Sequence, residues 1–120
     1  MSVRIYLPTT LLRLAEEHGA GAFEVTDDVV VLEVLDTDGD DEEAEYDALM
    51  TAADASATLL DGPGRRVVVV AELDQEPETG WTIPLKRVVA VHADPEDRPA
   101  DADPDDDLAW FATQEIPHLL

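Results

Sequence analysis

The spacing of hydrophobic residues predicts the longest helix of the chain between Glu42 and Leu60. The stretch reads EEAEYDALMTAADASATLL, and its apolar positions recur every three or four residues. They form one face: Tyr46, Leu49, Met50, Ala53, Ala57 and Leu60. The opposite face carries Glu45, Asp47, Thr51, Asp54 and Thr58. Because the C-terminal half of the apolar face is made of small residues, we expect this helix to lie close against Val67–Val70 and the strands beside it.

Short apolar or alternating runs predict strands elsewhere in the chain. They are Val3–Leu7, Ala22–Thr26, Val67–Val70, Trp81–Ile83 and Val88–His92. Val67–Val70 is apolar on both faces, which is typical of an interior strand. Pro8 is expected to end the first strand. Val29–Leu35 is ambiguous: its β-branched residues favour a strand, but Thr26 or Asp27 could equally cap a short helix there.

Two shorter helices are predicted near the ends of the chain. The first runs from Leu11 to His18, with Thr9 or Thr10 as its N-cap and Gly19 as its stop. Its expected buried side is Leu11, Leu12, Leu14 and Ala15. The second runs from Leu108 to about Glu115, after the acidic residues 105–107, and Pro117 is expected to end it.

These elements predict an α+β fold. We expect a single layered domain with a mixed or antiparallel sheet of four to five strands, covered by two to three helices. Residues 1–93 form the predicted core domain, and residues 94–107 form an acidic, proline-rich linker. Residues 108–120 are the predicted C-terminal helix and tail, packing back on the core. The chain has no cysteine, so disulfides and thiolate zinc sites are excluded.

The large net negative charge of the chain disfavours some classes of binding partner and favours others. Asp and Glu number 29 against 7 Lys and Arg, for a net charge of −22 among 120 residues. Such a chain has no reason to approach nucleic-acid phosphates or an anionic membrane, whereas a basic protein partner would be attracted. The alternative is that the acidic surface only keeps the protein soluble. MSVRIYLPTT lacks the features of a signal peptide and the apolar runs are shorter than a membrane span, so we expect a cytoplasmic protein.

The acidic stretch DTDGDD resembles a calcium-binding loop. Asp36, Asp38 and Asp40 match the first three ligand positions of an EF-hand. Position 6 is Asp41 in place of glycine, and position 12 is Asp47 in place of glutamate. We therefore expect an ordinary solvated loop, with no metal and no other cofactor.

His92 and Asp94 are the candidate catalytic residues. Two residues apart at a strand end, they share a face if the strand continues, and a carboxylate that orients an imidazole raises its basicity. The alternative is a surface histidine beside a loop acid. No nucleophile motif, glycine-rich phosphate loop or H-E-x-x-H pattern accompanies the pair.

Trp110 and Gln114 are the candidate binding residues. On the predicted last helix they would lie one turn apart, with Leu108, Phe111 and Glu115 on another side. Aromatic residues on a terminal helix usually anchor it to the core. The functional alternative is a contact surface for a partner.

Three stretches resemble one family of small acidic proteins of unknown function from high-GC Gram-positive bacteria. They are VRIYLPTTLLRL, EEAEYDALMTAADASATLL, and VVAVHAD together with WFATQEIPHLL. The resemblance implies a short helix after Val25-Thr26, from which DDVVVLEVLD departs. It implies no activity.

Three functions are compatible with the sequence. A small non-enzymatic interaction or regulatory protein is favoured, because the acidic segments suit a basic partner and a catalytic constellation is missing. An enzyme with a site around His92, Asp94 and the C-terminal helix is the first alternative. An acidic mimic of nucleic acid is the second. The oligomeric state is left open.

Overall fold

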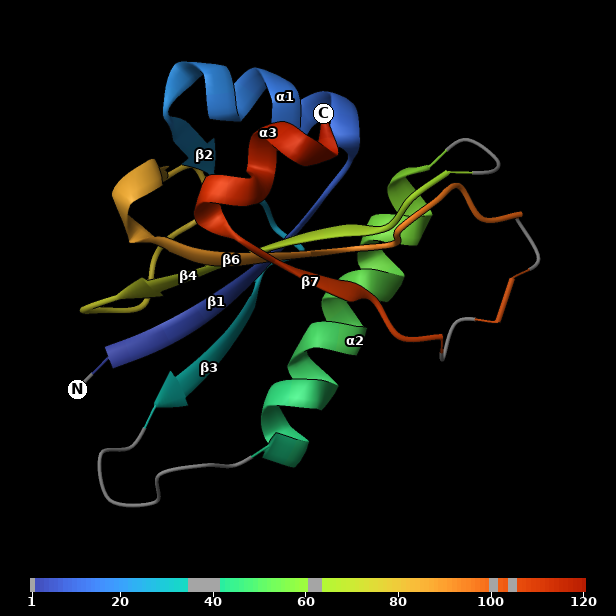
Figure 1. Cartoon of the computed structure of the whole chain (residues 1–120). Coiled ribbons are helices and arrows are strands. Elements are labelled where there is room, and N and C mark those ends of the chain that lie inside the picture. Colours follow the sequence, from blue (N-terminus) through green and yellow to red (C-terminus); the bar gives the residue numbers. More distant parts are fainter. Residues whose placement is uncertain (1, 35–41, 61–63, 100–101, 104–105) are drawn as a thin grey trace.

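The computed structural model describes residues 2–34, 42–60, 64–99, 102–103 and 106–120. An antiparallel sheet has five strands in the order β3-β1-β4-β6-β7, and β2 pairs with β5 in a second, smaller sheet (Figure 1). The strands are β1 (Ser2–Thr9), β2 (Ala22–Glu24), β3 (Val30–Val34), β4 (Val67–Leu73), β5 (Thr82–Pro84), β6 (Val88–Ala93) and β7 (Ala109–Ala112). The helices are α1 (Leu11–Ala20), α2 (Glu42–Leu59) and α3 (Ile116–Leu119), with 3₁₀ turns at Leu85–Arg87 and Thr113–Glu115. The predicted α+β class and single layered domain are confirmed.

The central strands follow the hydrophobic pattern. Val67–Val70 is buried on both faces of β4, which pairs with β1 and β6, so the prediction of an interior strand is confirmed. Val30–Val34 forms a strand and not a helix, as the β-branched residues indicated. The helix implied by the resemblance after Val25-Thr26 is not formed.

Pro8 does not end β1, contrary to expectation. The strand continues to Thr9, and Pro8 pairs with Val68 of β4. Pairing of β1 with β3 stops at Tyr6, so this end of β1 has a strand partner on one side only among the described residues. A proline, which lacks a backbone donor, is tolerated where one edge of the strand needs no partner.

Helix α1 begins as predicted but ends later. The Thr10 side chain accepts a hydrogen bond from the Arg13 backbone N–H at 3.3 Å, so Thr10 is the N-cap. The helix runs through Gly19 to Ala20, and Gly21 is its C-cap. The φ of Gly21 is 74°, the left-handed conformation that glycine adopts without strain. Two residues predicted to be buried, Leu12 and Ala15, are exposed, because a single turn around Leu14 makes the contact with the core.

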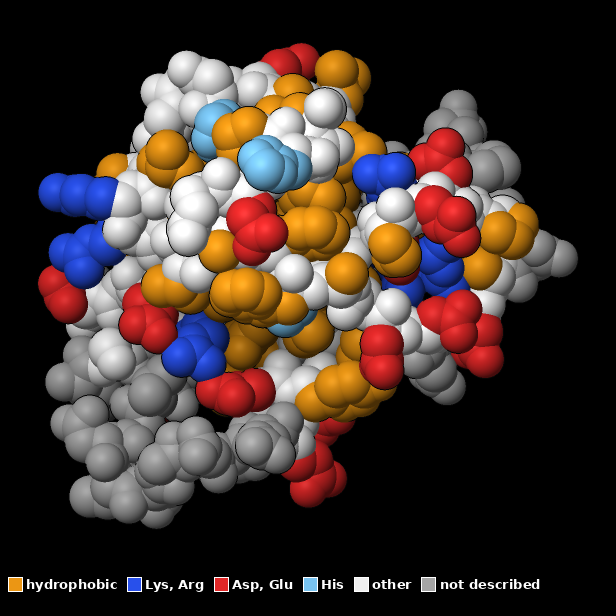
Figure 2. All heavy atoms as spheres, in the orientation of Figure 1, with side chains coloured by type: hydrophobic (Ala, Val, Ile, Leu, Met, Phe, Trp, Pro, Cys, Tyr) orange, Lys and Arg blue, Asp and Glu red, His pale blue; other side chains and the backbone are white. Residues whose placement is uncertain are grey.

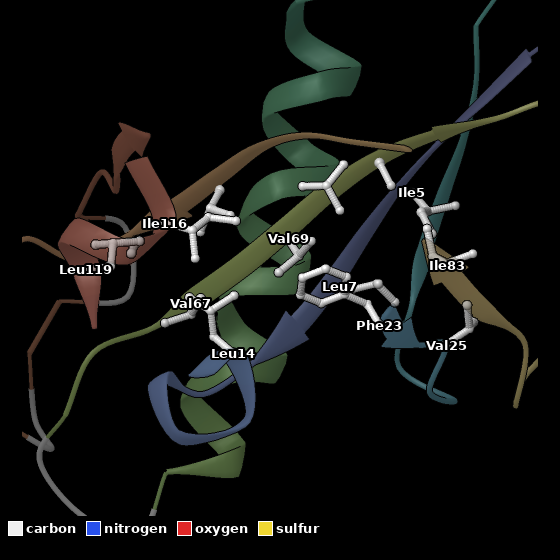
Figure 3. Close-up of a cluster of buried hydrophobic side chains, with 14 of the residues drawn as sticks. Ile5, Leu7, Leu14, Phe23, Val25, Val67, Val69, Ile83, Ile116 and Leu119 are labelled. Carbon is white, nitrogen blue, oxygen red and sulfur yellow. The ribbon is translucent and has the colours of Figure 1, made fainter. Parts of the chain in front are cut away.

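The sheet has a hydrophobic cluster on each face. The larger cluster lies between the sheet and the layer formed by α1, α3 and the β2-β5 pair, and Figure 3 shows it with α2 behind the strands. Its buried members include Ile5, Leu7, Leu14, Phe23, Val25, Val67, Val69, Ile83, Ile116 and Leu119. The smaller cluster joins the other face to α2 and consists of Tyr6, Ala48, Ala52, Ala53, Val68 and Val70. We call this second side the α2 face.

The helix predicted at residues 42–60 forms, but its buried stripe is rotated. Ala53 is buried as predicted. Ser56 is buried too, and so are Ala48 and Ala52, which were not assigned to that face. Tyr46 and Ala57, both assigned to it, are exposed. At about 100° per residue this is roughly a quarter turn from the predicted face. Small residues permit the rotation because the helix axis can then approach the strands closely.

A buried serine secures this close approach. The Ser56 hydroxyl donates to the Thr9 carbonyl at 2.6 Å and accepts from the Val67 N–H at 2.8 Å. Both hydroxyl functions are therefore satisfied by backbone groups of β1 and β4. Ser56 consequently connects α2 to the two central strands.

The predicted helix at Leu108–Glu115 is wrong. Residues 109–112 form the edge strand β7 and residues 113–115 a 3₁₀ turn. Pro117 does not end a helix but lies in the first turn of α3, where its missing N–H has no helical partner to lose. Ile116 and Leu119 of α3 are buried in the larger cluster, so the chain end packs against the core.

Candidate interaction surface

Helix α2 covers only part of the α2 face. It packs against β3, β1 and β4, and its main contacts in the described chain do not extend to β6 and β7. The side of α2 that carries Tyr46 is directed toward β7, because the Tyr46 hydroxyl donates to Asp107 Oδ1 at 3.2 Å just before that strand. Among the described residues, the main contacts of α2 therefore end at β4, and Trp110 on the edge strand β7 is exposed.

Along one row of side chains across the sheet, solvent exposure increases from β4 to β7. Val68, His92 and Trp110 are cross-strand neighbours on β4, β6 and β7, and so share the α2 face. Val68 is fully buried, His92 is half-buried, and Trp110 is 59% exposed. In the next row, Val70 and Ala90 are buried and Ala112 is half-buried. We call Ala90, His92, Trp110 and Ala112 the β6–β7 surface.

Aromatic and acidic side chains border this surface. Tyr46 on α2 is 47% exposed, and Leu108 packs against the small cluster just ahead of Trp110. Asp106 and Asp107 are exposed immediately before β7, and Glu115 follows it. Figure 2 shows hydrophobic side chains at the molecular surface around a hollow, below the position that β7 has in Figure 1. The area thus combines exposed aromatic rings with carboxylates.

A buried ion pair holds the segment that leads into β7. Arg66 donates from Nε to Asp94 Oδ2 at 3.0 Å and from a terminal nitrogen to Oδ1 at 2.8 Å. The Arg66 backbone N–H also donates to Oδ2 at 2.8 Å. The two residues are 2% and 1% exposed. This bidentate geometry is the strongest form of a carboxylate–guanidinium contact.

The ion pair extends to the chain in front of β7. Arg66 donates to the Asp106 carbonyl at 2.8 Å, and Arg98 lies 3.7 Å from Asp94 and 3.3 Å from Asp106. Asp94 and Arg98 both belong to the stretch predicted to be a linker. Its first residue is nevertheless buried, and Arg98 pairs with Gly64 in an isolated β-bridge. The entry to β7 is therefore fastened to the start of β4.

The environment of Asp94 keeps it ionised. Burial alone would raise the pKa of its carboxyl group, but hydrogen bonds from the Arg66 side chain and backbone and the charges of Arg66 and Arg98 hold the pKa below its ordinary value. Burial lowers the pKa of His92, since the imidazolium form loses hydration. His92 is accordingly neutral at physiological pH.

His92 and Asp94 do not form the arrangement expected of a general base and its orienting acid. Both oxygens of Asp94 are engaged by Arg66, whereas His92 lies in the row with Val68 and Trp110. An orienting carboxylate would raise the pKa of the histidine, but that pKa is lowered. The geometry assigns Asp94 to holding the fold and leaves His92 beside the exposed tryptophan.

The remaining candidate residues are two proposed for binding and three aspartates considered for a metal site. Trp110 and Gln114 are both exposed, but one lies on β7 and the other in the 3₁₀ turn, so they are not one helical turn apart. Asp36, Asp38 and Asp40 lie outside the described residues. Within the described ranges, no three His, Asp or Glu side chains gather in a way that could hold a metal ion.

Sequence reasoning missed two residues of this region. Arg66 was not singled out, and the signal that could have found it is a cation directly before the apolar run Val67–Val70. Tyr46 was assigned to the core. The spacing placed it in the middle of the apolar stripe and gave no signal that it borders the surface instead.

Comparison with known proteins places the chain in a family. A sequence profile described as a family of unknown function matches residues 3–120. The chain belongs to DUF6912. Membership in DUF6912 agrees with the resemblance to an uncharacterised family and brings no activity with it. No curated protein and no solved structure matches the chain. In the described part of this DUF6912 protein, no helix has the length and apolar character needed to cross a membrane.

Proposed function

We propose that this protein is a non-enzymatic interaction protein that binds a basic segment of another protein at the β6–β7 surface. The observation that carries the proposal is the exposure of Trp110 on a sheet face that α2 leaves uncovered. A tryptophan in the middle of a short strand has a large apolar area to bury. Exposed aromatic residues of this kind are typical anchors of protein interfaces.

Charge supports a basic partner. The net charge is −22, and carboxylates border Trp110 on both sides along the chain, at Asp106, Asp107 and Glu115. Lys or Arg side chains would meet these carboxylates and also pack over the indole ring, where a cation is attracted to the aromatic face. The same charge speeds association at low ionic strength and makes binding sensitive to salt.

The chemistry of the neighbouring groups favours binding over catalysis. Asp94 is committed to Arg66, and His92 lacks an acidic partner among the contacts described for it. The surface also offers no serine, threonine or lysine nucleophile on its four positions, Ala90, His92, Trp110 and Ala112. We therefore favour the interaction protein over the enzyme around His92 and Asp94.

A capture experiment with matched variants tests the proposal. Immobilised wild-type protein is exposed to extract of the native cell at about 0.05 M and about 0.5 M salt, a range over which the screening length falls severalfold. We expect a basic protein to be retained at low salt and released at high salt. Trp110→Ser should reduce its retention by about tenfold, the effect of losing one interface anchor.

The control is Leu12→Ser. Leu12 is 72% exposed on α1, on the opposite side of the sheet, so this variant removes a comparable exposed apolar group without touching the β6–β7 surface. Circular dichroism melting establishes that both variants are folded. Equal capture by Trp110→Ser and wild type, or equal losses in both variants, would contradict the proposal.

A further inference from the structure

Strand β7 ends the five-stranded sheet with an unpaired edge. It pairs with β6 through Ala90–Ala93, and no other strand of the described chain lies beside it. The Ala112 N–H donates to Glu115 Oε1 at 2.9 Å and so points away from β6. In an antiparallel ladder, backbone groups of alternate residues point to the same edge. The N–H and C=O of Trp110 are therefore directed outward as well.

Glu115 limits how much of this edge is available. Its carboxylate satisfies the outward N–H of Ala112 and thereby occupies one end of the edge. Native proteins often protect edge strands in this way, with a charged residue or a short strand. At the other end Leu108 precedes the strand and is half-buried against the small cluster. The accessible edge is thus short and centred on Trp110.

We propose that the basic partner segment binds in extended form as an additional strand beside β7, hydrogen-bonded to the backbone of Trp110. This inference rests on the proposed function and specifies how the same surface is used. Backbone hydrogen bonds supply affinity in strand addition, and alternate side chains supply specificity. A Lys or Arg directly opposite Trp110 would lie on the α2 face, over the ring.

The acidic residues near the β7 edge favour a cationic strand as the binding partner. Asp107 precedes β7 and Glu115 follows it, so an added strand meets a carboxylate near each end. A second copy of this chain would bring another −22 to the contact, which opposes pairing of two β7 edges. A cationic extended segment has the complementary charge and the alternating side chains that the edge requires.

The test uses a defined probe, an octapeptide of alternating Lys and Val. Its affinity is compared by calorimetry with that of an analogue in which esters replace the backbone amides, so that side chains and charge are kept but donors are lost. We expect the ester analogue to bind about tenfold more weakly, because it cannot donate a hydrogen bond to the Trp110 carbonyl. An alternating Glu and Val octapeptide, which has the opposite charge, should not bind.

Hydrogen exchange locates the contact independently of affinity. On addition of the Lys–Val octapeptide, the Trp110 amide should exchange about tenfold more slowly, since it gains an acceptor. The Ala112 amide is the internal control, because Glu115 already accepts its hydrogen bond. Protection at Trp110 without a change at Ala112 supports strand addition.

The outcomes separate the two proposals. Equal affinity of the amide and ester probes, with no protection of the Trp110 amide, would overturn strand addition. If binding is then still lost in Trp110→Ser, the proposed function stands with a different binding mode. Absence of saturable binding of the Lys–Val octapeptide up to about 1 mM contradicts strand addition, and the capture experiment with Trp110→Ser then decides the proposed function separately.

Discussion

At the scale of single residues, Arg66 and Asp94 form a buried, hydrogen-bonded ion pair. Both are almost completely buried, and the carboxylate receives three hydrogen bonds from Arg66. A buried ion pair adds little net stability relative to apolar residues, but removal of one partner leaves an uncompensated charge. The ion pair instead fixes the position of Asp106 and of the segment before β7 relative to β4.

Asp94→Ala should therefore lower the free energy of unfolding by about 3–5 kcal/mol, the usual cost of breaking a buried pair. Asp97→Ala is the matched control, since Asp97 is exposed and lies 3.9 Å from Arg65. It should change stability by less than about 0.5 kcal/mol. Denaturant unfolding monitored by circular dichroism gives both values. Similar small changes for the two variants would show that the pair does not hold this segment.

His92 predicts a dependence of stability on pH. Its pKa is lowered in the folded state from an ordinary value of 6.5, because it is partly buried. Between these two pKa values the unfolded chain binds more protons than the folded protein, so stability rises with pH in that window. The free energy of unfolding should thus fall as the pH is lowered through 6.5 and below.

Substitution isolates this contribution from that of the many carboxylates. The difference in unfolding free energy between wild type and His92→Gln should change between pH 7.5 and pH 5.5, on either side of the ordinary histidine pKa. Asp94 does not interfere, because its pKa is lowered from 3.8 and its contribution is lost only in stronger acid. A difference that is constant across this pH range would mean that His92 titrates alike in both states.

At the scale of elements, α2 is placed by its small residues rather than by its large ones. Ala48, Ala52 and Ser56 face the sheet, while Tyr46 is left at the border of the β6–β7 surface. In the described chain, the main contacts of the helix are with β3, β1 and β4, and Trp110 on β7 is exposed. The candidate interaction surface therefore depends on how this helix packs.

Ala52→Leu tests the position of α2. Ala52 is fully buried against Val68 and Val70, so added methyl groups must push the helix from the sheet, at about 1–3 kcal/mol. Ala57→Leu, at an exposed position of the same helix, should change stability by less than about 0.5 kcal/mol. Thermal or denaturant unfolding distinguishes them. A larger loss of stability in Ala57→Leu than in Ala52→Leu would show that α2 buries the face predicted from the hydrophobic spacing.

At the scale of the whole molecule, net charge dominates. The chain has 29 acidic and 7 basic residues. Arg4, Arg65, Arg66, Arg87 and Arg98 already form ion pairs, and Arg4 bridges Glu45 of α2 and Glu72 of β4. Most carboxylates must therefore be without a cationic partner, and folding brings them closer together.

The melting temperature should rise as sodium chloride is increased from about 0.01 M to about 0.15 M. Over this range the screening length falls from about 30 Å to about 8 Å, which weakens repulsion between exposed carboxylates. Differential scanning calorimetry at constant pH measures the change. A melting temperature that falls with salt would show that the ion pairs around Arg4 and Arg66, rather than net repulsion, control stability.

Local patterns in the sequence determined most of the elements. The two-sided burial of Val67–Val70, the length of α2 and a threonine cap on α1 depend on neighbouring residues, and these features were predicted. The segment of β3 was left open between strand and helix, although its β-branched residues favoured the strand that forms. The acidic composition likewise follows from the sequence, and with it the proposal of a basic partner. These properties are readable because propensity, capping and charge act over a few residues.

Contacts between distant residues decided the rest. Ala-Trp-Phe-Ala is too short for its period to distinguish helix from strand, and pairing with β6 makes it β7. An alanine on a helix can be either buried or exposed, so the alanines of α2 do not determine which face is buried. The fit of α2 against the sheet sets its rotation and leaves Trp110 exposed. Asp94 and Arg66 are 28 positions apart, and only the register of β4 and β6 brings them together. Register and rotation depend on the packing of the whole chain, so the candidate site belongs to the tertiary structure.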